Sequence, residues 1–343
     1  MQRIGILTGG GDCPGLNPVI RAVVRKGISL DYEIIGIKDG WRGLIEFDYS
    51  LLNLNSVSGI LPKGGTILGT SRTNPYKKEG DLKRLKDNFK KLNLHALITV
   101  GGEDTLGVAA KIIKDGPSNI VGIPKTIDND LSLTDYTFGF DSALNIAMDC
   151  IDRLHTTAES HHRVIVIEVM GRHAGWIATL AGMAGGADVI LIPEVSLSLE
   201  QVCDMLKKRH QRGKTFSIVV ASEGAKLKGD SFVLQEAEHD EFGHVHLGGI
   251  GEILGQEIQK RTGFETRVSI LGHLQRGGSP TAFDRVLGTR FGVRAVELVK
   301  CKNFGRMVAL SGTKIVDVPI DQAAGVLKTV DMELYEVAKV FFG

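Results

Sequence analysis

Cysteine is scarce in this 343-residue chain, and its four cysteines stand far apart. Cys13, Cys150, Cys203 and Cys301 form neither a CxxC pair nor the spacing of a metal site. This pattern argues against a thiol redox motif and against a cysteine-based zinc site. Isolated cysteines suit a reducing cytosol, where most of them serve as small core residues. We therefore expect a cytoplasmic protein.

The chain also lacks an excess of charge and any long apolar run. Lys and Arg number 41 against 40 Asp and Glu, so no overall positive field would attract nucleic acid. The N-terminus has no apolar region of signal-peptide length, because glycines and an acid soon follow Arg3. The longest weakly charged stretch, 174–187, is glycine-rich and too short to span a membrane. These features predict a soluble protein without nucleic-acid or membrane partners.

Glycine, in contrast, is abundant, and its 43 residues suit an enzyme with many tight phosphate-binding turns. Apolar runs that resemble strands alternate with helical patterns, which predicts an α/β fold of doubly wound, mainly parallel sheets. The length allows two lobes, each with its own core. We expect strands at 3–8, 33–37, 96–100, 120–123, 164–169, 188–192, 216–221, 267–271 and 307–310. We expect helices at 16–26, 77–91, 105–113, 141–154, 251–262 and 284–298, and an inserted hairpin or loop at 226–248.

The segment 96–130 organises the rest of the chain. It contains two expected strands, and each of them ends in a polar loop, at 101–104 and at 124–130. Ligands of open parallel sheets bind in the crevice beyond the carboxyl ends of the strands. We therefore expect the active site at these two loops.

The side chains of these loops suit phosphoryl transfer, which requires a metal ion, fixed cations and a carboxylate near the accepting hydroxyl. Glu103 can hold a divalent metal, and Lys125 can neutralise phosphate oxygens. Asp128 and Asp130 supply two carboxylates, while the preceding glycines and the helix N-terminus favour an anion. A simpler interpretation also exists, in which Glu103 and Asp104 are first-turn helix acids and the Asp-Asn-Asp run is a turn.

Two other glycine-rich loops have the same character. The loop Gly9-Gly10-Gly11-Asp12 follows the first strand, but Pro14 occupies the place of the third glycine of a dinucleotide fingerprint. A nicotinamide-dinucleotide site of that kind is therefore not expected. The loop 64–72 ends on Arg72, which is either a solvated charge or an anion ligand.

Six motifs taken together resemble the phosphofructokinase family: TGGGDCPGLNPVIRAVV, GGTILGTSR, GGEDT, PKTIDND, EVMGRHAGWIA and GHLQRGGSP. They occur in order between about residues 4 and 310. The resemblance implies two doubly wound lobes between which the chain crosses. The larger lobe would comprise 1–139 plus 252–305, and the smaller 140–251 plus 306–320, followed by a C-terminal helical extension at 321–343.

The resemblance also implies roles for individual residues. Asp128 would be the base that takes the proton of the sugar 1-hydroxyl, with support from Asp130. The positions that hold fructose 6-phosphate would be Thr126, Met170, Gly171, Arg172, Glu223, His273 and Arg276. Arg163 and Arg267 would be contributed by a neighbouring subunit of a homodimer or homotetramer. The phosphoryl-donor and Mg²⁺ side would comprise Gly10, Arg72 and Glu103, with Glu103 as the metal ligand.

Two departures from the ATP-using pattern of the family concern the donor. Asp104 replaces a glycine after the metal-binding acid, and Lys125 replaces a glycine before Thr-Ile-Asp. Both changes resemble the pyrophosphate-dependent branch. Asp104 would repel the α-phosphate of ATP, and Lys125 would supply a cation to a small donor, so both would act in catalysis together with Asp128 and Arg172.

Other functions remain open at this point. One alternative is an ATP-dependent phosphofructokinase that tolerates Asp104, and another is a kinase of the NAD or lipid type, which shares a GGD-like turn. A non-catalytic regulatory subunit would be expected to lack Asp128, Glu103 or Arg172, and none of these is missing. The preferred interpretation is a reversible pyrophosphate:fructose-6-phosphate phosphotransferase.

Overall fold

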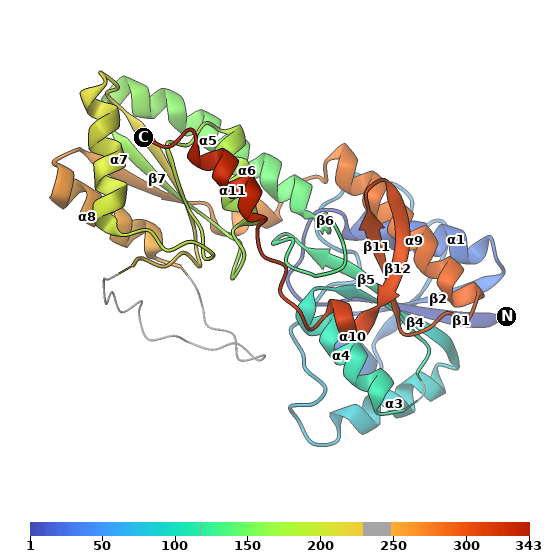
Figure 1. Ribbon diagram of the computed structural model, residues 1–343. Helices are drawn as coiled ribbons and strands as arrows, with labels where there is room; N and C mark the ends of the chain where they lie inside the picture. The colour runs from blue at the N-terminus through green and yellow to red at the C-terminus, as the bar shows by residue number, and fades with distance from the viewer. Residues whose placement is uncertain (117, 229–247) are drawn as a thin grey trace.

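The computed structural model describes residues 1–116, 118–228 and 248–343 as an α/β fold built on two sheets (Figure 1). The larger sheet has eight strands in the order β12-β11-β5-β4-β1-β2-β3, with β6 beside β5, and the smaller has four in the order β10-β7-β9-β8. The strands are β1 Gln2–Thr8, β2 Tyr32–Ile37, β3 Tyr49–Leu52, β4 Leu94–Gly101, β5 Ile120–Thr126, β6 Phe138–Gly139, β7 Val164–Val169, β8 Val189–Leu191, β9 Ser217–Ser222, β10 Thr266–Ile270, β11 Arg306–Ser311 and β12 Lys314–Pro319.

The helices cover both sheets, and several of them connect parallel strands. They are α1 Leu16–Ile28, α2 Trp41–Glu46, α3 Asp81–Lys91, α4 Glu103–Lys114, α5 Phe140–His161, α6 Trp176–Ala184, α7 Leu199–Gln211, α8 Ile250–Thr262, the 3₁₀ helix η1 Gly272–Arg276, α9 Ala282–Lys300, α10 Ile320–Ala323 and α11 Met332–Lys339. The predicted fold class is confirmed, and the expected elements lie where the periodicity placed them, although α5 continues to His161.

Alternation along β1 shows how the larger sheet is covered on both faces. Ile4 and Ile6 belong to the core that α1 and α9 complete, whereas Leu7 belongs to the core beneath α2, α3 and α4. All three side chains are fully buried. Each contributes about 1.5–3 kcal/mol of transfer free energy. A strand buried on both faces reads as a continuous apolar run, which is why its position in a parallel sheet was predictable.

The strand pairings place β10 and the hairpin β11–β12 in other sheets than the expected lobe boundaries imply. The range 252–305 was expected in the larger lobe, and its helix α9 packs on α1 and β5 there. In the same range β10 pairs with β7 in the smaller sheet, where α8 packs on both strands. The range 306–320 was expected in the smaller lobe, but β11 pairs with β5 and β12 in the larger sheet. The apolar centre of β11 is buried there by neighbours on each side. By contrast, β10 is an edge strand and leaves Ile270 exposed.

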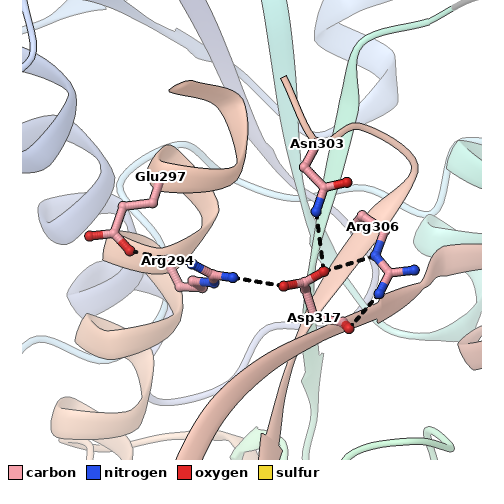
Figure 2. Close-up of polar contacts among 5 residues, drawn as sticks. All are labelled: Arg294, Glu297, Asn303, Arg306 and Asp317. Atoms are coloured by element: carbon pink, nitrogen blue, oxygen red, sulfur yellow. Dashed lines mark hydrogen bonds and ion pairs between the residues drawn. The ribbon is translucent and has the colours of Figure 1, made fainter. Parts of the chain in front are cut away.

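Polar contacts attach the β11–β12 hairpin to α9 (Figure 2). The carboxylate of Asp317 accepts hydrogen bonds from Nη2 of Arg294 at 2.8 Å, Nε of Arg306 at 2.9 Å and Nδ2 of Asn303 at 3.3 Å. Burial opposes the charge, but the two guanidinium groups outweigh it and hold the pKa of Asp317 below its usual value. The hairpin is thereby fixed beside β5, which carries the loop with Asp128.

Several elements were not predicted from the sequence, among them β3, α6, α7 and β12. The C-terminal extension contains α10 and α11, and Tyr335 of α11 donates from its hydroxyl to the carbonyl of Ile190 at 2.8 Å. Most of the expected insertion at 226–248 lies outside the described residues. Of the helices in the described ranges, none has both the length and the apolar character of a membrane span.

Candidate active site

A pocket lies where the loops after β1, β4 and β5 meet the turn after β7. The carboxyl ends of parallel strands share one edge of their sheet, so these loops converge, as the sequence predicted. The pocket is lined by Gly10, Gly11, Asp12, Arg72, Gly102, Glu103, Asp104, Thr105, Lys125, Thr126, Ile127, Asp128, Asp130, Arg172 and Arg276. Almost all of these side chains are polar or charged, and four are cationic, which suits ligands that carry phosphate groups.

The glycine loop after β1 brings backbone close to a cation. The backbone N–H of Gly10 donates to the carbonyl of Ser71 at 3.0 Å, and Oγ1 of Thr70 donates to the carbonyl of Gly10 at 2.6 Å. A Cβ atom on Gly11 would lie 1.5 Å from Nη1 of Arg276. Only glycine therefore allows Arg276 to reach this wall of the pocket.

Lys125 lies within β5 and is only 4% exposed, so it is not a solvated loop cation. Its Nζ donates to the carbonyl of Gly11, which holds the ammonium against the glycine loop. Burial lowers the pKa of Lys125, and the nearby Arg276 acts in the same direction. A phosphate bound beside this cation would remove part of the electrostatic cost of burying it.

Asp128 has the environment of a general base. The carboxylate is 5% exposed, and its buried Oδ1 has no hydrogen-bond partner among the described residues. Burial, followed by the charges of Asp130 and Glu223, raises the pKa of Asp128 to about 7, against the opposing effect of two arginines. A carboxylate with one unoccupied oxygen and a pKa near neutrality can accept a proton from a substrate hydroxyl.

The loop that carries Asp128 is closed by its own side chains. The backbone N–H of Asp128 donates to Oγ1 of Thr126 at 3.0 Å. Asn129 adopts a left-handed conformation with φ of 51°, and its side chain bridges to the backbone of Thr137 at 3.1 Å and Asp135 at 3.2 Å. Asparagine tolerates this conformation well. The turn suggested by the Asp-Asn-Asp run is therefore real, and it presents a carboxylate to the pocket on each side of Asn129.

Arg172 enters the pocket from the smaller sheet, whereas most of the other lining residues belong to the larger one. The backbone N–H of Arg172 donates to Oε1 of Glu223 at 3.1 Å. A Cβ atom on Gly224 would lie 1.8 Å from the carbonyl oxygen of Arg172, so glycine is required for this close packing. Burial raises the pKa of Glu223, and the backbone hydrogen bonds from Arg172 and Gly171 oppose that shift.

Glu103 and Asp104 occupy the first turn of α4 and also line the pocket, so both interpretations of their position hold geometrically. In the described ranges there is no cluster of three or more His, Cys, Asp or Glu that could hold a metal ion. Proteins often bind divalent cations such as Mg²⁺ through one or two carboxylates together with substrate phosphates and water. Burial also raises the pKa of Asp130, which faces the same pocket.

The predicted site residues fall into three groups. Those that line the pocket are Gly10, Arg72, Glu103, Asp104, Lys125, Thr126, Asp128, Asp130, Arg172 and Arg276. Met170, Gly171 and Glu223 adjoin Arg172 but do not line the pocket. His273 is exposed on η1. Gly11, Asp12, Gly102, Thr105 and Ile127 also line the pocket but were not named as site residues, although their loops were.

Arg163 and Arg267 lie elsewhere, at the beginnings of β7 and β10. Both of them contact the carboxylate of Glu265, at 2.8 Å and 2.6 Å. The two strands are parallel, and Arg172 follows the opposite end of β7. These two arginines therefore do not line the pocket of their own chain.

Comparison with known proteins gives consistent matches. The phosphofructokinase family model matches residues 3–299. The pyrophosphate–fructose 6-phosphate 1-phosphotransferase of Streptomyces coelicolor is 58% identical over 343 residues, which cover all of both chains. The ATP-dependent 6-phosphofructokinase 3 of the same organism is 50% identical over 98% of this chain and 99% of its own. The crystal structure of Pichia pastoris phosphofructokinase in the T-state is 35% identical, with a TM-score of 0.84. The match covers 99% of this chain and 38% of that longer one.

Proposed function

Because the chain belongs to the phosphofructokinase family, we propose that it transfers a phosphoryl group reversibly from pyrophosphate to the 1-hydroxyl of fructose 6-phosphate. The products are fructose 1,6-bisphosphate and phosphate. The observation that carries the choice of donor is that Asp104 and Lys125 line the same pocket as Asp128. Full-length relatives at 57–58% identity bear the corresponding name.

In this mechanism Asp128 removes the proton of the 1-hydroxyl, since its raised pKa and unoccupied oxygen suit a general base. Asp130 raises the basicity of Asp128 by repulsion. Arg172 and Arg276 neutralise the phosphates. Thr126 orders the loop that carries Asp128, because its Oγ1 accepts a hydrogen bond from the backbone N–H of Asp128. Met170, Gly171, Glu223 and His273 complete the sugar-phosphate side.

The donor side comprises Gly10, Arg72, Asp104 and Lys125. The fixed ammonium of Lys125 stabilises negative charge that develops during transfer, without reorganisation at the moment of reaction. Glu103 would hold Mg²⁺, which supplies charge neutralisation on the phosphate oxygens when bound.

The direct test compares donors in the unmodified protein. With fructose 6-phosphate and Mg²⁺ present, a coupled spectrophotometric assay should give faster turnover with pyrophosphate than with ATP at millimolar concentrations of each. Faster turnover with ATP would replace the proposal by an ATP-dependent phosphofructokinase. That second function is favoured by one observation, the 50% identity to a full-length ATP-dependent relative.

We propose further that active sites are shared between subunits, because the family resemblance places Arg163 and Arg267 at such an interface and both lie away from the pocket of their own chain. Arginine suits bidentate recognition of a phosphate on a neighbouring molecule. Mixing the inactive Arg163→Ala and Asp128→Asn proteins under exchange conditions should restore part of the activity, because some sites would combine two intact halves. Labelled subunits must be shown to exchange. If they exchange and no activity returns, the sites are not shared.

A further inference from the structure

The segment 324–331 passes from the larger sheet to the smaller one (Figure 1), and its backbone pairs with the loop that carries Asp128. α10 (Ile320–Ala323) begins the crossing and packs on α4 and β12, and α11, after the segment, packs on α6 and β8. Leu327 forms an antiparallel bridge with Leu131. The backbone N–H of Lys328 donates to the carbonyl of Asp130 at 2.8 Å. This segment is therefore in direct backbone contact with the loop of the proposed base.

The side chain of Lys328 holds the same loop a second time. Its Nζ donates to the carbonyl of Thr134 at 2.9 Å and to the carbonyl of Asp135 at 2.6 Å. The carbonyl of Asp135 also accepts from Asn129, the residue between the two pocket carboxylates. Hydrogen bonds from an ionised donor are about twice as strong as neutral ones. One ammonium group thus fixes the returning half of the loop.

Lys328 also contacts Trp176, which follows the turn that the smaller sheet contributes to the site. Trp176 donates from Nε1 to the carbonyl of Lys328 at 3.1 Å, and its ring centroid lies 4.9 Å from Nζ. Trp176 begins α6, directly after the turn that contains Arg172. The carboxylate of Glu194 reinforces this junction, because it accepts from the backbone N–H groups of Gly175 at 3.0 Å and Val330 at 2.9 Å.

From these contacts we propose that Lys328 is a positioning residue that keeps Asp128 and Asp130 in fixed relation to Arg172. The inference rests on the proposed function, since it assumes that Asp128 accepts the proton and that Arg172 binds the sugar phosphate. Lys328 does not line the pocket and touches no substrate in this arrangement. Burial lowers the pKa of Lys328 to about 8, with Asp135 and Asp130 opposing the shift, so the ammonium form predominates at neutral pH.

The expected effect is on turnover more than on binding. A displacement of about 1 Å by a substitution remote from the chemistry can cost about 10²-fold in rate. Lys328→Met keeps the length of the side chain but leaves the carbonyls of Thr134 and Asp135 without their cation. We expect kcat to fall about 10- to 100-fold while the KM for the phosphoryl donor changes by less than about threefold.

The experiment compares four proteins: wild type, Lys328→Met, Lys328→Arg and Lys339→Met. Lys339 is a matched control, because it also lies in the C-terminal extension but pairs with Glu336 on the surface. Lys328→Arg retains a cation and should recover a substantial part of kcat, whereas Lys339→Met should behave as wild type. Hydrogen exchange should quicken in residues 127–137 of Lys328→Met and remain unchanged in β1 and β4. Should Lys328→Met fail to fold, Lys328→Gln, which keeps a neutral donor, is measured in its place.

Two results would overturn the inference: a kcat of Lys328→Met within threefold of wild type, or equal losses in the Met and Arg variants with unchanged exchange in 127–137. Each variant is measured with whichever donor the wild type prefers. A preference for ATP would refute the proposed donor but leave the kcat and exchange comparison intact, so the two failures are distinguishable.

Discussion

Asp128→Asn should lower kcat by about 10²- to 10⁴-fold, because that is the usual contribution of a positioned general base. The amide has nearly the same shape but cannot accept the proton of the sugar hydroxyl. Fructose 6-phosphate should still bind within a few-fold of wild type, since Arg172 and Arg276 remain. Steady-state kinetics give both quantities, and Asp149→Asn on the exposed face of α5 serves as the control. Turnover of the Asp128 variant within a few-fold of wild type would remove the assignment.

The pH dependence gives an independent check on Asp128. The carboxylate must be ionised to act as a base, and its pKa in the folded protein is raised to about 7. Wild-type kcat/KM should therefore rise as pH increases through about 7, and this limb should be absent from the residual activity of Asp128→Asn. The raised pKa of Asp128 in the folded protein favours its neutral form. The fold therefore loses stability as pH rises from the pKa of the unfolded state, about 3.9, through that of the folded state, about 7. At pH 8 the Asn variant should thus unfold at a temperature no lower than wild type, which separates lost catalysis from lost folding.

Asp104→Gly should raise activity with ATP by up to about a thousand-fold. A carboxylate about 4 Å from the α-phosphate repels it by ~4 kcal/mol at an effective dielectric constant near 20. At ~1.4 kcal/mol per tenfold, this repulsion corresponds to roughly three orders of magnitude in rate. The measurement is the ratio of kcat/KM for ATP to that for pyrophosphate.

A control is needed because Asp104 also lies in the first turn of α4. Glycine there costs helix stability of up to about 1 kcal/mol, and loss of the acid removes about 0.3–1 kcal/mol of dipole interaction. Asp104→Asn removes the charge but keeps the size of the side chain. Equal losses with both donors, accompanied by a lower unfolding temperature, would mean that Asp104 is only a helix-end acid.

The companion substitution at Lys125 should act on the other donor. Lys125→Gly should mainly abolish the use of pyrophosphate, but glycine also weakens the interior of β5. Lys125→Met fills the same buried space and is the cleaner variant. Loss of a fixed cation at developing negative charge should cost about 10²–10³ in turnover with pyrophosphate. Unchanged turnover with pyrophosphate would show that Lys125 has no part in donor binding.

The sequence was most informative where function and local structure share one signal. Glycine turns after apolar strands located the loops of the pocket. The parallel order of these strands explained why Asp104 and Lys125 line the same pocket. The burial of Lys125 was less accessible, since proline and lysine after an apolar run read as the start of a loop, whereas β5 continues to Thr126. Nothing around Lys328 marks it out, because its role depends on contacts with residues that are remote in the chain.

The sheet membership of β10 and β11 could not be read from the sequence, because both are short strands and the chain changes sheets between them. That order has a consequence for synthesis of the protein. When the first 250 residues have left the ribosome, β7 still lacks its neighbour β10, and β5 still lacks β11. Two open strand edges then exist at once in the nascent chain, and such edges can pair with other chains. Neither sheet can be completed before synthesis enters the last quarter of the polypeptide, so these edges stay open while most of the chain is already made.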